Sequence, residues 1–217
     1  MAHPSNREIE VKLRVSDVSR LRRLLRRLGA VSSGRIFESN TLYDDAQNHL
    51  RKSGRLLRLR VEIPARTLKP PARTRDGRLP PVRHALLTYK APVPRKGIAP
   101  GQLRYKVREE VEVQVGDPSR LEMILGGLGL RPGFRYEKFR TTYRLPGLKN
   151  LVVVLDETPI GPFLELEGPK SAIDQAARRV GYALRDYNPM TYWSLYHDEC
   201  RRRGVRPRNM VFTRRKN

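Results

Sequence analysis

The sequence predicts an α+β fold built on an antiparallel sheet or barrel. Eight segments have the composition and alternation of β-strands, and hairpin-like spacings separate them. A smaller number of segments have the apolar spacing and the end signals of helices. The two halves of the chain also repeat when one is shifted by about 100 residues. Together these observations favour antiparallel strands with a few helices packed on them.

The first expected strand, REIEVKLRV, spans residues 7–15 and alternates charged and apolar side chains. Successive side chains of a strand point to opposite faces, so Glu8, Glu10 and Lys12 share one face and apolar residues occupy the other. The other expected strands are ESNTLYDD, GRLLRLRVEI, HALLTYKAP, RYKVREEVEVQV, RYEKFRTTYRL, NLVVVLDE and PFLELEG. Nearly every one of them contributes to a charged face.

The first two expected helices have matching start and stop signals. One follows Ser16 or Asp17 as N-cap and ends at Gly29, and the other follows Asp117 and ends at Gly129. Their apolar stripes, which we expect to face the core, are Val18, Leu21, Leu24, Leu25 and Leu28 in the first and Leu121, Ile124, Leu125 and Leu128 in the second.

Two more helices and one long insertion complete the expected elements. A third helix begins near Ser171 and runs to Gly181, and a fourth, within YNPMTYWSLYHDEC, follows Pro189. The segment PARTLKPPARTRDGRLPPVRHA is dense in Pro and Arg around an Asp-Gly turn signal. We interpret it as a long, flexible hairpin insertion between two strands.

The internal repeat relates the two halves position by position. Asp17 corresponds to Asp117 and Gly29 to Gly129, and the correspondence extends outward to Glu10 with Glu110, Thr41 with Thr141 and Tyr43 with Tyr143. Each half is thus a charged strand, an amphipathic helix and another strand. Two such halves related by a pseudo-twofold axis would place the helices outside, and the charged strand faces would then look at one another.

Composition limits the chemistry available to the chain. It has 217 residues with a formal net charge of +23, which attracts phosphate-bearing partners of any kind. The lone Cys200 and the four scattered histidines form no zinc pattern, so any metal would be held by carboxylate oxygens. No apolar run is long enough to span a membrane, and residues 1–10 lack a signal-peptide core, so we expect a cytoplasmic protein.

The charged strand faces carry paired bases on some strands and paired carboxylates on others. A solvated sheet face is one interpretation, although surfaces usually mix both signs with neutral polar residues. The other is a closed interior, where charges are costly without counter-charges or a ligand. Such an interior would suit an anion and a metal together, with bases holding phosphoryl oxygens and carboxylates holding Mg²⁺ or Mn²⁺.

The sequence also carries a family resemblance. Residues 8–12, EIEVK, match the ExExK motif of the CYTH, or triphosphate tunnel metalloenzyme, family, which includes class IV adenylyl cyclases, thiamine triphosphatases and inorganic triphosphatases. The family's further motifs follow in order as LYDDAQNHLRKSGRLLRLR, LTYKAP, REEVEV, EKFRTTY and LDETPIGPFLELEG, before a Tyr-containing C-terminal helix. The chain resembles the family over roughly residues 7–200.

The resemblance implies an antiparallel eight-stranded β-barrel tunnel with helices packed outside, which binds a linear triphosphate together with Mg²⁺ or Mn²⁺. We therefore expect one tunnel domain over residues 1–200, interrupted by the insertion at about 64–85, and a basic C-terminal tail over 201–217. The insertion and the tail both look like mobile appendages. Neither belongs to the part of the sequence that resembles the family.

The resemblance also implies roles for individual residues. The expected metal-facing carboxylates are Glu8, Glu10, Glu110, Glu112, Asp156, Glu165 and Glu167, of which Glu112 and Asp156 could instead orient a neighbouring base. The expected triphosphate-binding bases are Lys12, Arg58, Arg60, Lys90, Arg108, Lys138 and Arg140. We expect Glu8, Glu10 and Lys12 to act in catalysis.

Three functions are compatible with these motifs. We favour metal-dependent hydrolysis of a linear triphosphate, inorganic or organic, because it needs no base-recognition pocket and no covalent nucleophile. The alternative enzyme is a class IV adenylyl cyclase, which converts ATP to cyclic AMP and pyrophosphate. A non-enzymatic alternative is contact of the basic tail and insertion with polyphosphate or nucleic acid, but an anion binder gains nothing from carboxylates that repel its ligand. The sequence gives no prediction of oligomeric state.

Overall fold

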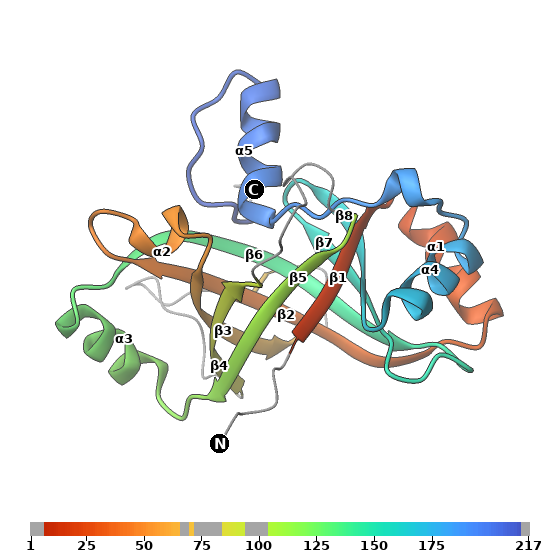
Figure 1. The fold of residues 1–217 in the computed structure, drawn as a ribbon, viewed down its shortest axis with the longest axis horizontal. Coiled ribbons are helices and arrows are strands. Elements are labelled where there is room, and N and C mark those ends of the chain that lie inside the picture. Colours follow the sequence, from red (N-terminus) through yellow and green to blue (C-terminus); the bar gives the residue numbers. More distant parts are fainter. Residues whose placement is uncertain (1–6, 66–69, 72–83, 94–103, 214–217) are drawn as a thin grey trace.

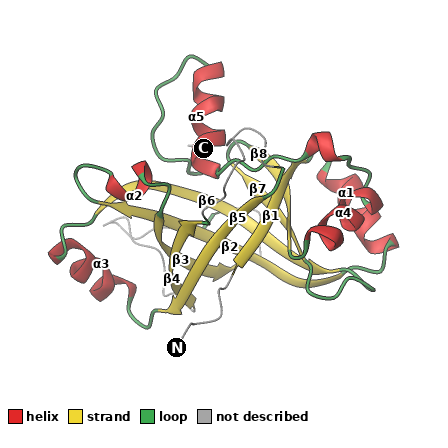
Figure 2. Cartoon of the chain, in the orientation of Figure 1, coloured by secondary structure: helices red, strands yellow, loops and turns green. Residues whose placement is uncertain are grey.

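A closed eight-stranded antiparallel β-barrel forms the centre of the molecule (Figures 1 and 2). The computed structural model describes residues 7–65, 70–71, 84–93 and 104–213. Neighbouring strands follow the order β1-β5-β4-β3-β2-β6-β7-β8, after which β8 pairs with β1. The predicted antiparallel barrel with helices outside is confirmed. Most of the predicted insertion at about 64–85 lies outside the described residues.

Each strand overlaps the segment that predicted it, although β2 begins at Val31 rather than Glu38 and β6 at Arg131 rather than Arg135. Their bounds are β1 Arg7–Arg14, β2 Val31–Asp44, β3 Leu56–Pro64, β4 His84–Pro92, β5 Lys106–Gln114, β6 Arg131–Arg144, β7 Val152–Thr158 and β8 Gly161–Glu167. The two long strands, β2 and β6, pair over most of their length with a register shift between Ser32 and Arg35 and another after Leu42. Irregularities of this kind bend strands and help a sheet to close.

The strand order shows the predicted relation between the halves. Exchanging β1 to β4 with β5 to β8 gives the same ring of strands read in the opposite direction. A pseudo-twofold axis requires that the strand order be unchanged when the two halves are exchanged, and this order meets that requirement. β2 with β6, and the helices that precede them, also begin 100 residues apart.

The helices cover the barrel unequally. Their bounds are α1 Val18–Arg27, α2 His49–Lys52, α3 Pro118–Gly127, α4 Lys170–Arg179 and α5 Tyr192–Arg202, and a 3₁₀ turn spans Leu184–Asp186. α1 and α4 share one buried core with the outward-facing apolar residues of β1, β7 and β8. Asp17 caps α1 by accepting a hydrogen bond from the backbone N–H of Arg20 at 2.9 Å. The short helix α2 was not predicted.

α3 differs from the prediction made for its apolar stripe. Leu125 is buried against the barrel and Leu121 is partly buried, but Ile124 is 59% exposed and Leu128 is 70% exposed. α1 gains a second covering layer from α4, whereas α3 lies on the barrel without a neighbouring helix among the described residues (Figure 1). The repeat in sequence therefore gave equivalent helices with unequal burial.

α5 and the chain after it seal one side of the barrel. Tyr192 and Leu195 of α5 pack with Phe134, Phe163 and other residues in a second buried core. The chain then turns back beside β6, where the backbone N–H of Met210 donates to the Arg135 carbonyl at 2.9 Å. The predicted tail over 201–217 is thus not a separate appendage as far as residue 213: it begins inside α5, and its later part docks on β6.

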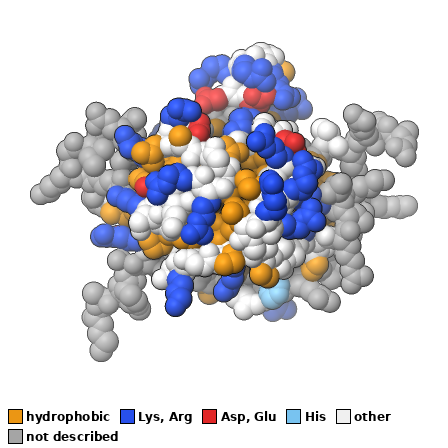
Figure 3. Space-filling view, turned by 90° about the vertical axis from the view of Figure 1, so that its right-hand side faces the viewer, with side chains coloured by type: hydrophobic (Ala, Val, Ile, Leu, Met, Phe, Trp, Pro, Cys, Tyr) orange, Lys and Arg blue, Asp and Glu red, His pale blue; other side chains and the backbone are white. Residues whose placement is uncertain are grey.

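The outer surface agrees with the strongly positive sequence. Lys and Arg gather on the face formed by α1 and α4, where few acidic side chains are visible (Figure 3). Arg23, Arg26 and Arg27 of α1 and Arg178 and Arg179 of α4 are exposed there. None of the described helices combines the length and apolarity needed to cross a membrane.

We expect Met210→Ala to destabilise the fold by about 2–5 kcal/mol, because the Met210 side chain is 1% exposed within the core that seats α5. Chemical denaturation monitored by circular dichroism measures the free energy of unfolding. Met123→Ala, at a position 77% exposed on α3, is the matched control and should change stability by less than about 0.5 kcal/mol. Equal effects of the two substitutions would contradict the docking of the C-terminal segment.

Candidate functional site

The barrel encloses a cavity of about 560 Å³ lined by charged side chains. Among the described residues, ten Lys or Arg and seven Asp or Glu line it. Most come from the inward parity of the strands, as the alternation predicted, and the α2 region and the start of α5 contribute the rest. The charged strand faces therefore look inward, and the lining carries an excess of positive charge.

The carboxylates of β1 are paired with bases of β4 and β5. The register places Glu10 opposite Lys106 on β5, and the Lys106 ammonium donates to the Glu10 carboxylate. Lys90 on β4 donates to Glu8 at 2.5 Å and lies 3.0 Å from a Glu110 oxygen. Bases and carboxylates thus alternate across these three strands, which reduces the cost of burying each of them.

Lys12 occupies the centre of the β1 side of the cavity. Its Nζ atom lies 2.9 Å from Glu10 and 3.1 Å from Glu165, and the residue is only 3% exposed. Burial alone would lower the pKa of Lys12, but Glu10 and Glu165 raise it above its ordinary value. Lys12 therefore remains a cation.

Asp156 organises the bases of β6. It accepts hydrogen bonds from Lys138 at 2.7 Å and from two nitrogens of Arg140 at 2.8 and 2.7 Å, and the Tyr192 hydroxyl donates to it at 2.9 Å. Its side chain is fully buried, and Asp156 is not among the described residues that line the cavity. Asp156 is thus placed to orient bases, which was one of its two predicted roles.

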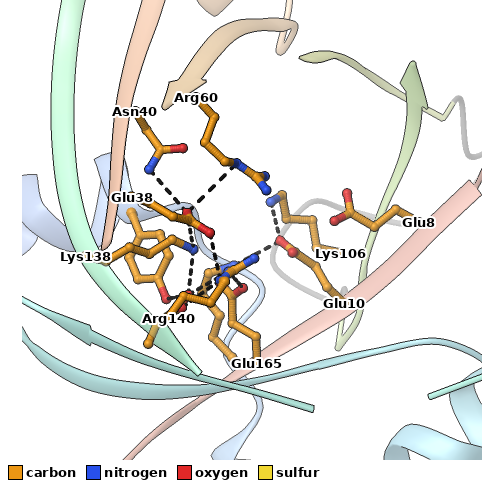
Figure 4. Close-up of polar contacts among 12 residues, drawn as sticks. Glu8, Glu10, Glu38, Asn40, Arg60, Lys106, Lys138, Arg140 and Glu165 are labelled. Carbon is orange, nitrogen blue, oxygen red and sulfur yellow. Dashed lines mark hydrogen bonds and ion pairs between the residues drawn. The ribbon is translucent and has the colours of Figure 1, made fainter. Parts of the chain in front are cut away.

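Glu38 on β2 belongs to the same cluster and was not predicted. Its fully buried carboxylate lies 3.3 Å from both Lys138 and Arg140 and 3.9 Å from Arg60 (Figure 4). Although burial alone would raise it, the pKa of Glu38 is held well below its ordinary value by these bases. The signal was present in ESNTLYDD, where Glu38, Asn40 and Leu42 share one parity.

The sequence analysis also missed other residues in the cavity wall or directly behind it. Lys106 of β5 was not among the predicted site residues, although it pairs with Glu10. The Tyr136 hydroxyl accepts a 3.4 Å hydrogen bond from Arg58, and Thr88 accepts one from the same guanidinium at 3.1 Å. Uncharged polar residues carry no charge signal in a sequence, which explains why Tyr136 and Thr88 were missed.

Two guanidinium groups near the cavity each have one nitrogen that makes no hydrogen bond to the described residues. The Nε atoms of Arg58 and Arg60 are buried, and within the described residues neither makes a hydrogen bond. Both arginines line the cavity. Guanidinium groups that line a cavity can bind a ligand that brings acceptor oxygens.

Comparison with known proteins identifies the family. A family model described as the CYTH domain matches residues 6–190. The chain belongs to the CYTH domain family. Its charged cavity is therefore the CYTH tunnel, and α5 together with the C-terminal segment that docks on β6 lies beyond the matched residues.

Relatives of this CYTH chain share its fold at low sequence identity. A protein of Methanocaldococcus jannaschii named "Putative adenylate cyclase" is 25% identical over 168 residues, which cover 77% of this chain and 80% of the relative. The Pyrococcus horikoshii protein PH1012 has a structure similar at a TM-score of 0.61, with 24% identity, 87% of this chain and 98% of that chain covered. HpAC1 from Hippeastrum, described as a putative adenylyl cyclase with a dominant triphosphatase activity, matches at a TM-score of 0.55 and 18% identity, with 88% and 96% covered.

The carboxylates near one edge of the CYTH tunnel carry negative charge that their neighbours do not fully neutralise. Burial, followed by repulsion from Glu8, raises the pKa of Glu167 to about 7. Burial and repulsion from Glu10 likewise raise the pKa of Glu8. The register places Glu167 directly across from Glu10 on β1. Oxygen donors with this excess of negative charge suit a hard divalent cation.

The seven predicted metal-facing carboxylates do not form one cluster. Among the described residues, no three or more His, Cys, Asp or Glu side chains lie close enough together to hold an ion by themselves. The reason is that bases stand between them, such as Lys90 beside Glu110 and Arg58 near Glu112. Mg²⁺ is commonly held by one or two carboxylates plus water and substrate phosphate, and one or two of Glu8, Glu10 and Glu167 would suffice for that mode.

The pH dependence of stability provides a test of the Glu167 environment. A raised pKa in the folded state stabilises the fold below pH 4.5, and this contribution is lost as the pH rises through about 7. We therefore expect the free energy of unfolding to fall less steeply between pH 4.5 and 7 in Glu167→Gln than in the wild type. Denaturation curves at several pH values measure it. Glu109→Gln, at an exposed position on β5, should follow the wild type.

Proposed function

We propose that this CYTH protein hydrolyses a linear triphosphate in a metal-dependent reaction inside the tunnel. The observation that carries the proposal is that the guanidinium groups of Arg58 and Arg60 line the same cavity as the under-neutralised carboxylates Glu8 and Glu167. A triphosphate with a divalent cation brings the acceptor oxygens and the positive charge that these two groups lack.

The bases of the cavity would hold the phosphate chain. Arg58, Arg60, Lys90, Lys138 and Arg140 surround the cavity from β3, β4 and β6, so oxygens of successive phosphoryl groups can each find a cation. Their ion pairs with fixed carboxylates hold them in place before substrate arrives. Charge stabilisation by groups already in position is the main source of rate enhancement in phosphoryl transfer.

The reaction needs an attacking water and a proton acceptor. One or two of Glu8, Glu10 and Glu167, together with substrate phosphate, would hold the divalent cation, which when bound would supply Lewis-acid activation of water and phosphate. The oxygen of water forms a bond to the terminal phosphorus, and the bond to the bridging oxygen breaks, releasing orthophosphate and a diphosphate. A cavity carboxylate that does not hold the cation takes the proton.

Adenylyl cyclase activity is the second candidate, because the M. jannaschii relative is named as a putative enzyme of that kind. The same bases could hold ATP while its ribose 3′-hydroxyl attacks the α-phosphorus. The description of HpAC1 joins both activities in one protein of similar fold, which supports testing them together. Cytoplasmic location and contact of the basic tail with polyphosphate or nucleic acid remain predictions.

Product analysis separates the two reactions. Purified protein is incubated with inorganic tripolyphosphate or ATP in the presence of Mg²⁺, Mn²⁺ or EDTA, and the products are identified by ion chromatography. We expect orthophosphate that depends on the divalent cation. Cyclic AMP with pyrophosphate as the main products of ATP would instead establish the cyclase.

Replacement of Glu10 tests the role that we propose for the carboxylates of the tunnel. We expect Glu10→Gln to lower kcat/KM about 100-fold, because it removes a charge next to both Lys12 and Lys106 at the proposed metal edge. Glu109→Gln, at an exposed position on β5 whose side chain does not line the cavity, is the matched control and should retain wild-type activity. Unfolding curves of both variants show whether they are folded. Full metal-dependent turnover by folded Glu10→Gln would refute the proposal.

A further inference from the structure

Two helices concentrate positive charge on one outer side of the barrel. Arg23, Arg26 and Arg27 of α1 and Arg178 and Arg179 of α4 are exposed there, and Lys and Arg side chains gather on this side of the molecule (Figure 3). We call these five arginines the basic face. None of them lines the tunnel cavity, so the proposed function gives the basic face no role.

The C-terminal ends of α1 and α4 meet at one turn. Gly29, directly after α1, lies so close to this turn that a Cβ atom there would be 3.3 Å from the Pro146 ring. From α4, the Arg179 guanidinium donates to the Pro146 carbonyl at 3.3 Å. The exposed residues Arg144 and Lys149 flank the same turn in the sequence. Positive charge therefore continues from one helix to the other.

The acidic residues of the two helices do not neutralise the basic face. Asp17 caps α1, and Asp174 of α4 accepts hydrogen bonds from two tyrosine hydroxyls at 2.6 and 2.8 Å. Within the described part of the chain, Arg23, Arg26 and Arg27 make no ion pair. Like charges held close together repel one another, so the basic face costs the fold some stability. A partner with negative charge would remove that cost.

The second half of the chain shows that the fold does not require these arginines. The α3 residues at the repeat positions of Arg23, Arg26 and Arg27 are Met123, Gly126 and Gly127. The last turn of α1 holds two basic residues, and the last turn of α3 holds none. Stabilisation of the helix dipole would favour basic residues in both helices, and so would a preference for arginine throughout the chain. Neither explanation accounts for the difference, which points to a role specific to the α1 side.

The chemistry of the basic face suits phosphate groups. A guanidinium can donate two parallel hydrogen bonds to phosphate oxygens. The arginines of α1 are closely spaced, because a helix rises only about 6 Å over the four residues from Arg23 to Arg27. A nucleic-acid duplex presents one phosphate for about every 1.7 Å of its axis, so several of the arginines can each reach a phosphate.

The composition of α1 and α4 favours a duplex over other anionic partners. Neither helix contains an aromatic residue, and no large apolar side chain of either helix is exposed. Proteins bind single strands by stacking bases on aromatic rings, and a helix that lies on a membrane buries an apolar face in it. The backbone of a duplex needs neither, because basic side chains alone can hold its phosphates.

We propose that the basic face binds the phosphate backbone of double-stranded nucleic acid. This binding function is separate from the reaction in the tunnel and from the contact predicted for the C-terminal tail. Phosphate contacts carry no sequence information, so binding is independent of base sequence. The expected dissociation constant at physiological salt is about 1–100 μM, the usual range for such contacts.

The first experiment measures binding by fluorescence anisotropy over a series of KCl concentrations. The probe is a labelled DNA duplex with 5′-hydroxyl ends, which offers the tunnel no triphosphate. We expect Arg26→Gln/Arg27→Gln to raise the dissociation constant at low salt at least about tenfold and to reduce the slope of log K against log salt by about 2.

The control removes the same charge from the tail. Arg206→Gln/Arg208→Gln changes two exposed arginines and should raise the dissociation constant by less than about twofold. An equal or larger effect of this control would place binding elsewhere and overturn the inference. Wild-type protein that does not bind the duplex at low salt would also overturn it.

Circular dichroism shows whether the variants are folded. We expect Arg26→Gln/Arg27→Gln to keep the wild-type spectrum, because both side chains are exposed. If it does not fold, Arg23→Gln/Arg178→Gln repeats the test with one residue from each helix. Wild-type affinity in a folded variant of either kind would overturn the inference.

The second experiment distinguishes a duplex from a lipid surface. Beads that carry the duplex and vesicles of phosphatidylcholine with phosphatidylserine are incubated with the protein at equal phosphate concentration, and the retained fraction is measured after sedimentation. We expect the duplex to retain the larger fraction. A larger fraction on the vesicles would assign the basic face to membrane lipids and overturn the inference.

Discussion

The structure depends on neutralising the charges that barrel closure buries. The helices cover the apolar outer faces of the strands, so the charged faces must point into the barrel. Asp156 and Glu38 meet this requirement at the centre of the β6 side, where they are fully buried and hold Lys138 and Arg140 between them. Removing one partner of such a network would leave the others buried and uncompensated. The same pairing fixes the bases that face the cavity, so stability and function rest on one set of contacts.

The C-terminal part of the chain joins this network from outside the matched CYTH residues. The Tyr192 hydroxyl reaches Asp156, and its ring lies 5.2 Å from the ammonium of Lys12 and 5.3 Å from that of Lys138. Met210 then holds the segment after α5 on β6 through backbone hydrogen bonds on both sides. Residues beyond the repeated halves thus complete the wall of the tunnel. They add aromatic side chains to a lining that is otherwise largely ionic.

The two halves contribute equivalent strands but unequal chemistry. Glu10 and Glu110 occupy corresponding positions, and both point into the cavity, yet Glu10 pairs with Lys106 and Lys12 whereas Glu110 pairs with Lys90. Near Glu10, the additional carboxylate Glu167 makes no ion pair with the bases of the described chain and has a raised pKa. The duplicated fold thus supplies a symmetric frame, and local differences in neighbours make one edge suited to a cation and the rest suited to phosphate.

The sequence by itself determined the strands, the pseudo-twofold relation and the inward charged face, because period-two alternation and a 100-residue repeat are local and directly visible. All seven bases that it predicted to bind phosphate line the cavity. Only the tertiary structure decided which carboxylates remain under-neutralised, since that depends on which base lies across from each in the register. It likewise revealed the places of Glu38 on β2 and Tyr192 on α5 in the buried network of Asp156. Their proximity follows from barrel closure and the docking of α5, which no spacing within the chain records.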